Sequence, residues 1–496
     1  MQYFAEALPH QGFAPSRGYD AIVDQAAARL RTWGYEDVEV LAVPSDGDRY
    51  LWAFRTDPAW DVDEAELTMV RPRAQRLARF SEKRVCLARF SGPTDVQAPL
   101  VHVGEGVAAA HYEGLDIRGK IVLAWGTPGM VMQRAVWERG ALGLVWYRME
   151  GRKGTPDATA VIYTIPWKSL AGQPMTFAFS LSYNLGCELA RLLDRGEEVV
   201  LQAVVRSEVR PSHLRLATGV MRGRERPEQE VWLLGHCDHR NTGGINNLSG
   251  YGSTVEIARV LAQLVRDGTL PPPRRTIRFL WGAEHNAVMA YLHQRPEARR
   301  HILGAMSLDM VGMYRDKTGA RLTMRRTPHT MPHLINDVAE YLLDYVEARN
   351  EIDFSHVNIL VAEESTGMAD PILAPTGSQA SFNAAVAEFW GPSYQEDLTD
   401  GAIAVPTVLL SEWPDPYFHT ELDSIEMADP TQLRRVVALA GALAYYLAQA
   451  GAEDLPHLVA NAMARARARL GRQLVRSLEM IATAAPTDLP AAYREA

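Results

Sequence analysis

Four short apolar runs organise the second half of the chain. They lie at residues 231–234, 277–281, 305–308 and 405–410, and each has the length of a buried strand. An amphipathic stretch at 252–265 repeats its apolar positions with helical period. Strands and helices that alternate in this way predict a sheet with helices on both faces. We therefore predict an α/β fold built on a doubly wound, mixed sheet.

The first half of the chain opens with a helical pattern at residues 19–33 and a strand pattern at 38–43. From about residue 90 to 205 the pattern changes to short strand-like pieces separated by Gly and Pro, with one small helix near 132–139. This change predicts a compact, mostly β domain inserted into the α/β domain. The predicted domains are residues 1–90 (first part of the α/β domain), 91–205 (insert), 206–450 (metal-binding part of the α/β domain) and 451–496 (helical tail).

Each of the four apolar runs is followed by side chains that bind metals or move protons. In an open α/β sheet, functional groups collect beyond the carboxyl ends of the strands, so this recurrence predicts one site at one sheet edge. Imidazoles and carboxylates together suit zinc, iron, nickel or copper. The residues concerned are His236 and Asp238 after the first run, Glu284 and His285 after the second, Asp309 after the third and His419 after the fourth.

These motifs resemble peptidase family M28, the co-catalytic zinc aminopeptidases. The resemblance covers roughly residues 210–450 and implies a sheet of the zinc-exopeptidase type. The segment 91–205 resembles the protease-associated (PA) domain that several members of the family carry. The matching motifs are His236-Cys-Asp238, Gly244-Ile-Asn246-Asn247-Leu-Ser-Gly250, Gly-Ala-Glu284-His285, Leu308-Asp309 and Phe418-His419-Thr-Glu-Leu-Asp423.

The resemblance also implies roles for single residues. His236, Asp309 and His419 fall on metal ligands of the family. Asp238 falls on the carboxylate that orients the first histidine, which fixes its tautomer and raises its basicity. Glu284 falls on the general base that takes a proton from the attacking water.

Two positions depart from the family pattern. Asn246 stands where a carboxylate bridges two metals, and His285 stands where a second Glu is a ligand. Of three ligand carboxylates only Asp309 is kept, so two dications about 3.5 to 4 Å apart would lack compensating charge. We therefore expect one divalent transition metal, zinc first, with iron, nickel and copper as alternatives. Its candidate ligands are His236, His285, Asp309 and His419, and Asn246 is a further candidate.

The expected function is hydrolysis of peptide or amide bonds, in the manner of an aminopeptidase, with a small peptide or an amino-acid amide as substrate. The altered ligand set motivates one alternative, a specialised small-molecule metalloenzyme that catalyses amide hydrolysis, cyclisation or acyl transfer on the same scaffold. A second alternative is a non-catalytic pseudopeptidase that binds a ligand or partner. The presence of both Glu284 and Asp238 speaks against it, because a dead site needs no base.

Length, charge and cysteine content exclude several classes of protein. A chain of 496 residues exceeds one ordinary domain, and a formal charge of −9 argues against binding to nucleic acid. The three cysteines form no CxxC motif, so no disulfide framework is expected. The first residues lack a basic region followed by an apolar core, and no apolar run is long enough to span a bilayer. We expect a cytoplasmic protein without a membrane partner.

Two further segments bear on the site and on assembly. The stretch 363–404, rich in Gly, Pro, Ser and Thr, is long for a loop in a compact domain, so a role at the substrate pocket and disorder are equally open. The tail at 455–483 is an amphipathic basic helix. Its apolar side chains favour a docking or dimer helix over a membrane-surface helix, and we expect a homodimer.

Overall fold

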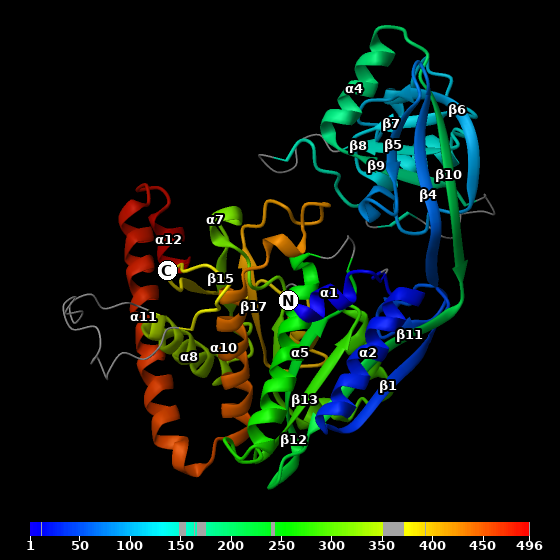
Figure 1. Cartoon of the computed structure of the whole chain (residues 1–496). Coiled ribbons are helices and arrows are strands. Elements are labelled where there is room, and N and C mark those ends of the chain that lie inside the picture. The colour runs from blue at the N-terminus through cyan, green and yellow to red at the C-terminus, as the bar shows by residue number, and fades with distance from the viewer. Residues whose placement is uncertain are drawn as a thin grey trace, which may run out of the picture.

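The computed structural model describes residues 1–10, 12–147, 155–162, 164–165, 175–239, 244–350, 372–391 and 393–495. Two large sheets dominate these residues, one in the main body and one in the insert (Figure 1). A small hairpin, β2 (Tyr50–Leu51) and β3 (Phe54–Arg55), contacts α6 (Asn286–Gln294) through β2.

The main sheet has eight strands and is mixed. Its centre, β13-β12-β14-β17, is parallel, while β1, β11 and β15 pair antiparallel with their inner neighbours. The predicted α/β fold with a mixed sheet is therefore confirmed. In spatial order the strands are β1 (Glu36–Ser45), β11 (Ser212–Met221), β13 (Arg275–Gly282), β12 (Arg226–His236), β14 (Ile302–Leu308), β17 (Thr407–Trp413), β15 (Arg321–Arg325) and β16 (Ala384–Ala387).

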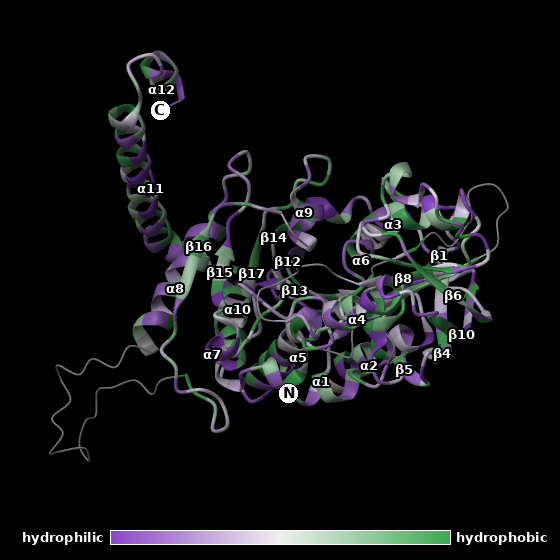
Figure 2. Ribbon diagram, turned by 90° about the horizontal axis from the view of Figure 1, so that it is seen from above, coloured by the Kyte–Doolittle hydropathy of each residue, from purple (hydrophilic) through white to green (hydrophobic). Residues whose placement is uncertain are grey.

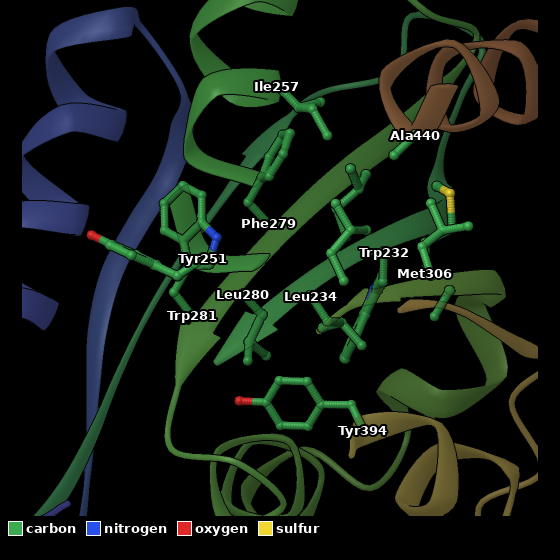
Figure 3. Close-up of a cluster of buried hydrophobic side chains, with 14 of the residues drawn as sticks. Trp232, Leu234, Tyr251, Ile257, Phe279, Leu280, Trp281, Met306, Tyr394 and Ala440 are labelled. Carbon is green, nitrogen blue, oxygen red and sulfur yellow. The ribbon is translucent and has the colours of Figure 1, made fainter. Parts of the chain in front are cut away.

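Helices cover both faces of this sheet, as the alternating pattern predicted. On one face, Ile257 and Ala440 reach the sheet from α5 and α10; on the other face Tyr394 closes the core from α9 (Figure 3). The first face carries α1 (Gln2–Ala7), α2 (Arg17–Trp33), α5 (Ile245–Arg266) and α10 (Pro430–Gln449), with α8 (Ile335–Asn350) beside α10. The other carries α6 (Asn286–Gln294) and α9 (Tyr394–Thr399).

Local sequence explains where the first long helix begins and ends. The Ser16 side chain accepts a hydrogen bond from the backbone N–H of Tyr19 and so caps the N-terminus of α2. At the other end Gly34 adopts a left-handed conformation with φ of 84°, which costs glycine little. Between them Ile22, Ala26 and Leu30 are fully buried on one face, as their spacing predicted.

The insert is a seven-stranded sheet that begins earlier than the sequence indicated. Its strands β4 and β5 lie within the residues assigned to the first part of the α/β domain, so the insert starts near residue 59 and not at 91. The half-polar alternation of β4 resembles that of β1, so no change of pattern marks the boundary. Likeness to a PA domain stays a prediction. The strands are β5 (Gln75–Arg79), β4 (Ala59–Arg71), β10 (Val200–Arg210), β6 (Thr94–His102), β7 (Ile121–Ala124), β8 (Gly143–Tyr147) and β9 (Phe177–Leu181).

Two long strands connect the insert to the main body. β4 and β10 pair antiparallel from Val200 opposite Arg71 to Arg210 opposite Ala59, and in Figure 1 they run together from the insert toward the main sheet. α4 (Tyr183–Asp194) packs on the insert sheet, and α3 (Pro128–Val131) is followed by a π-helical turn (Met132–Trp137). The buried apolar side chains of the insert form a hydrophobic core separate from that of the main body.

The tail forms α11 (Leu455–Thr483), followed by α12 (Leu489–Glu495). One face of α11 lies along α8, where Arg465 donates hydrogen bonds to Glu340 and Asp344. The rest projects away from the body (Figure 2). Within the described ranges no single helix is long and apolar enough to cross a membrane; Pro430–Gln449 and Ala452–Thr483 satisfy length and composition only as a pair, bent by 113°.

Candidate metal centre

The predicted site residues lie where strands of the main sheet end. His236 is the last residue of β12, and Asp309 directly follows β14. Glu284 and His285 lie between the end of β13 and the start of α6, and His419 lies in the loop after β17. These four strands are parallel neighbours, so their carboxyl ends meet at one edge of the sheet.

Asp238 holds two of these groups in place. Its Oδ1 lies 2.9 Å from Nδ1 of His236, and the backbone N–H of Glu284 donates to the same oxygen at 2.8 Å. A carboxylate on Nδ1 leaves Nε2 of the imidazole as the ligand atom and fixes the direction of the ring. The geometry therefore fits the orienting role that the sequence predicted for Asp238.

His236, Glu284 and Asp309 form a group whose ligand atoms all lie within 4.8 Å of one another. Nε2 of His236 lies 3.5 Å from Oδ1 of Asp309 and 3.9 Å from Oε1 of Glu284. Nε2 of His236 and Oδ1 of Asp309 are both buried and have no hydrogen-bond partner among the residues described. Buried polar atoms normally have partners. A metal ion would satisfy both atoms, so this group fits a divalent metal.

The electrostatics of the group favour a cation as well. Burial lowers the pKa of His236, but the carboxylates of Glu284 and Asp309 and the hydrogen bond to Asp238 outweigh it, so the pKa is raised well above its ordinary value. A pocket that stabilises a positive charge on a buried imidazole also attracts a metal ion, which would displace that proton.

His285 flanks the group and has a partner that the sequence analysis missed. Its Nδ1 lies 3.1 Å from Oδ2 of Asp397, while its Nε2 lies 3.8 Å from Oε1 of Glu284. Burial lowers the pKa of His285, but Asp397 and Glu284 raise it to about 9. The ring also stacks on Phe54 with centroids 6.3 Å apart. His285 therefore repeats the arrangement of His236, with a carboxylate on Nδ1 and Nε2 facing the site.

Asp397 belongs to α9, inside the stretch that the sequence analysis left open between a pocket role and disorder. Residues 363–371 of that stretch lie outside the described residues. In the described part, Tyr394 donates a hydrogen bond to the carbonyl of Ala283 at 2.9 Å, and its ring meets that of His236 edge-on. The only sequence signal for this contact was a cluster of acidic residues at 394–400. This part of the stretch therefore forms one wall of the site.

Asn246 and His419 lie together at another side of the site. Nδ2 of Asn246 is 2.9 Å from Nε2 of His419. Asp423 accepts hydrogen bonds from the backbone N–H groups of Ile245 at 2.6 Å and Asn246 at 3.2 Å, which joins the loop after β17 to the start of α5. These contacts bring the second and last motifs together, but the His236 group does not include His419.

The structure thus separates the predicted residues into two sets. His236 and Asp309 lie together as predicted ligands, and Glu284, predicted as the base, lies at ligand distance from them. His285 and His419 flank this group, each bonded to another side chain. The list of five ligands and of Asp238 and Glu284 as catalytic residues stays a prediction.

Comparison with known sequences places the site in a family. Residues 218–444 match the model of "Peptidase family M28". A glutamate carboxypeptidase 2 homolog of Caenorhabditis elegans is 29% identical over 119 residues, which cover 24% of this chain and 15% of the relative. Aminopeptidase NAALADL1 of Rattus norvegicus is 36% identical over 89 residues, which cover 18% and 12%. The chain thus spans well under two thirds of these relatives.

Solved structures share the fold over almost the whole chain. The zinc aminopeptidase BSAP of Bacillus subtilis has a TM-score of 0.60 at 16% identity, with 90% of this chain and 93% of that chain covered. The aminopeptidase of Aneurinibacillus sp. strain AM-1 has a TM-score of 0.52 at 19% identity, covering 91% and 93%. With its motifs at one sheet edge, this chain shares the fold of zinc aminopeptidases, and its residues 218–444 match the model of peptidase family M28.

Proposed function

We propose that this protein is a metal-dependent hydrolase of peptide or amide bonds, of the aminopeptidase kind, that works with one divalent metal ion, zinc first. The observation that carries the proposal is the buried pair of His236 Nε2 and Asp309 Oδ1, 3.5 Å apart without hydrogen-bond partners in the described part of the chain, beside the carboxylate of Glu284. The match of residues 218–444 to the model of a peptidase family supports the same chemistry.

His236 and Asp309 would hold the ion, and the Nε2 atom of His285 faces the same space from the side. A divalent ion there supplies Lewis acidity toward a substrate carbonyl and a water molecule. Glu284 is close enough to take a proton from that water and to return it to the leaving amine, which is the task of a general base and acid. Asp238 would orient both the ring of His236 and the backbone of Glu284 for this step, through its hydrogen bonds to them.

One ion is favoured over two because the site has lost ligand charge. An amide at Asn246 and an imidazole at His285 replace two carboxylates of the family pattern, so the ligand set is less negative by two charges. Asn246 also lies within hydrogen-bond distance of His419. Two dications in a partly buried pocket would repel each other with little compensation.

The paired side chains His285 and Asp397 favour a second candidate, a specialised small-molecule metalloenzyme on the same scaffold. An imidazole backed by a buried carboxylate presents a polarised N–H or a ligand atom where the family pattern has a carboxylate. One metal per chain, together with failure to cleave a panel of aminoacyl anilides and dipeptides, would favour this candidate over the aminopeptidase.

The first prediction tests the role of Glu284. Glu284→Gln should lower turnover of aminoacyl anilides by about 10²- to 10⁴-fold, because the amide cannot accept the proton. Metal content by elemental analysis should stay near one zinc per chain, because His236 and Asp309 remain. Glu297→Gln, a carboxylate beyond α6, is the matched control and should retain full activity. Unchanged turnover in Glu284→Gln would remove this residue from the mechanism, and metal-free wild-type protein would favour a pseudopeptidase.

A further inference from the structure

A short segment of the insert touches the loop that carries His419. Ala160 and Thr420 form an antiparallel bridge. On one side of it the backbone N–H of Val161 donates to the carbonyl of His419 at 2.9 Å; on the other the N–H of Glu421 donates to the carbonyl of Thr159 at 3.4 Å. The insert therefore meets the main body directly at a predicted metal ligand, far from the β4–β10 connection.

The side chain of Glu421 strengthens this contact. Its Oε2 accepts a hydrogen bond from the backbone N–H of Thr159 at 2.6 Å, and its Oε1 accepts one from Nζ of Lys83 at 2.8 Å. The Glu421 side chain is 10% exposed, so these charge-assisted bonds are less screened than those of a surface ion pair. Thr159 and Lys83 both belong to the insert, and Glu421 belongs to the main body.

The insert segment is itself firmly held. Ser180 of β9 donates a hydrogen bond from its hydroxyl to the carbonyl of Ala160 at 2.6 Å, and the N–H of Asn184 donates to the carbonyl of Pro156 at 3.0 Å. Ala160 and Ile162 are buried in the core of the insert. A rigid sheet therefore stands behind the contact with the loop.

The loop has reason to need such support. His419 has a positive φ of 58°, a region that non-glycine residues rarely occupy and that persists only when the surroundings enforce it. On one side Asp423 fixes the loop to the start of α5. On the other side the carbonyl of His419 is bound by Val161. The insert thus supplies one of the attachments that hold the backbone of His419 in place.

We propose that Glu421 and Lys83 are positioning residues: through them the insert holds the His419 loop, and the affinity of the centre for its metal depends on this contact between domains. The inference rests on the proposed metal site and on the predicted role of His419 as one of its ligands. It assigns the insert a role in assembling the centre.

Equilibrium zinc affinity of the full-length chain tests this directly. Glu421→Gln should raise the zinc Kd, measured by competition with a chromogenic chelator, by about 10-fold, since loss of an outer partner of a ligand costs about 10- to 100-fold. Lys83→Met should raise it less, about 3-fold, because Thr159 still donates to Glu421. The double variant should match Glu421→Gln, since both changes remove one shared interaction. Glu188→Gln, which breaks the Arg73–Glu188 pair elsewhere on the insert, is the matched control and should leave the Kd unchanged.

Hydrogen exchange of the metal-free chain gives a second readout. The amides of Val161 and Glu421 should exchange faster in Glu421→Gln than in wild type and in Glu188→Gln. Faster exchange with an unchanged zinc Kd would show a merely structural contact and overturn the inference. Unchanged exchange would overturn it too. The proposed function has its own test. If His236→Ala and Asp309→Ala bind zinc with the same Kd as wild type, the proposed function fails, whatever the exchange data show.

Discussion

At the residue scale, the charge of the centre depends on Asn246 and His285. Replacing them with carboxylates, Asn246→Asp together with His285→Glu, adds two negative charges beside His236 and Asp309. The double variant should bind close to two zinc ions per chain where wild type binds one, because added carboxylates offset the repulsion between two dications. Elemental analysis of protein dialysed against buffered zinc measures this ratio.

The single change Asn246→Asp is the control, because it adds one charge and leaves His285 paired with Asp397. We expect an intermediate result from it, with weak occupancy of a second ion. A wild-type chain with two ions, or a double variant that keeps one, would show that ligand charge does not decide the stoichiometry.

Prediction from the sequence worked best for residues that follow a recognisable strand. His236, Glu284 and Asp309 each come just after an apolar run, so their convergence followed from the sheet rule alone. The position of Asp397 in the site could not be predicted in this way, because its partner His285 lies 112 positions away and no periodic pattern links the two residues. The sequence did not predict a role for Glu421, although it lies within the His419 motif, because its contacts are with residues of the insert.

At the scale of single elements, β17 contains a buried carboxyl group, Glu412, whose pKa is raised by its surroundings. Glu412 accepts hydrogen bonds from the backbone N–H groups of Gly312 at 2.9 Å and Met313 at 2.7 Å, and from Gln432 at 3.1 Å. Burial raises its pKa from 4.5 to about 7, although these hydrogen bonds oppose the shift. The folded protein therefore binds a proton here at pH values where the unfolded chain has released it.

This shift predicts a pH-dependent difference in stability between wild type and Glu412→Gln. A raised pKa gives stability that is complete below about pH 4.5 and is lost as the pH rises through about 7. Glutamine does not titrate. The free energy of unfolding of wild type minus that of the variant should therefore fall between pH 5 and pH 8, by up to about 3 kcal/mol.

Urea unfolding of the metal-free proteins at several pH values measures this difference. Glu453→Gln replaces an exposed carboxylate and is the control. A difference that stays constant from pH 5 to pH 8, or that grows with pH, would contradict the assignment to Glu412.

Elements with a strong apolar pattern were predicted and weaker ones were not. α2, α5, α11 and the central strands follow their periodic stretches closely. β15 and β16 were not predicted, because they have only five and four residues. Arg321, Thr323 and Arg325 alternate with buried residues along β15, which is a strand pattern, but the run is too short to stand out.

At the scale of the whole molecule, the exposed face of α11 bears on assembly. Val459, Met463, Leu470, Leu474 and Leu478 form one stripe, and all are about half exposed or more. Their spacing is nearly the same read in either direction, with Arg467 completing the pattern. In two antiparallel helices related by a two-fold axis, residue i of one copy faces residue j of the other, and residue j faces residue i. A stripe with the same spacing in both directions is therefore complementary to itself. A second copy of the chain, with its α11 antiparallel, therefore suits this stripe.

Leu474→Glu with Leu478→Glu should convert the predicted dimer, of twice 55.1 kDa, into a monomer of 55.1 kDa. Each new carboxylate would be buried against an apolar side chain of the second copy, Met463 or Val459, which opposes association. Light scattering coupled to size-exclusion chromatography measures the mass. Leu115→Glu, at an exposed leucine of the insert, is the control and should keep the wild-type mass. A wild-type chain that stays monomeric at every concentration would refute the homodimer.

The two strands that carry the chain into and out of the insert share a rung at Ala59 and Arg210. Opposite residues on antiparallel strands lie only about 5 Å apart, so a short turn could bridge that gap. A gene could therefore gain or lose this entire module at a single splice point without rerouting any strand of the main sheet. Such a loss would also remove the bridge between Ala160 and Thr420, so the proposed support of the metal site by the insert would disappear with it.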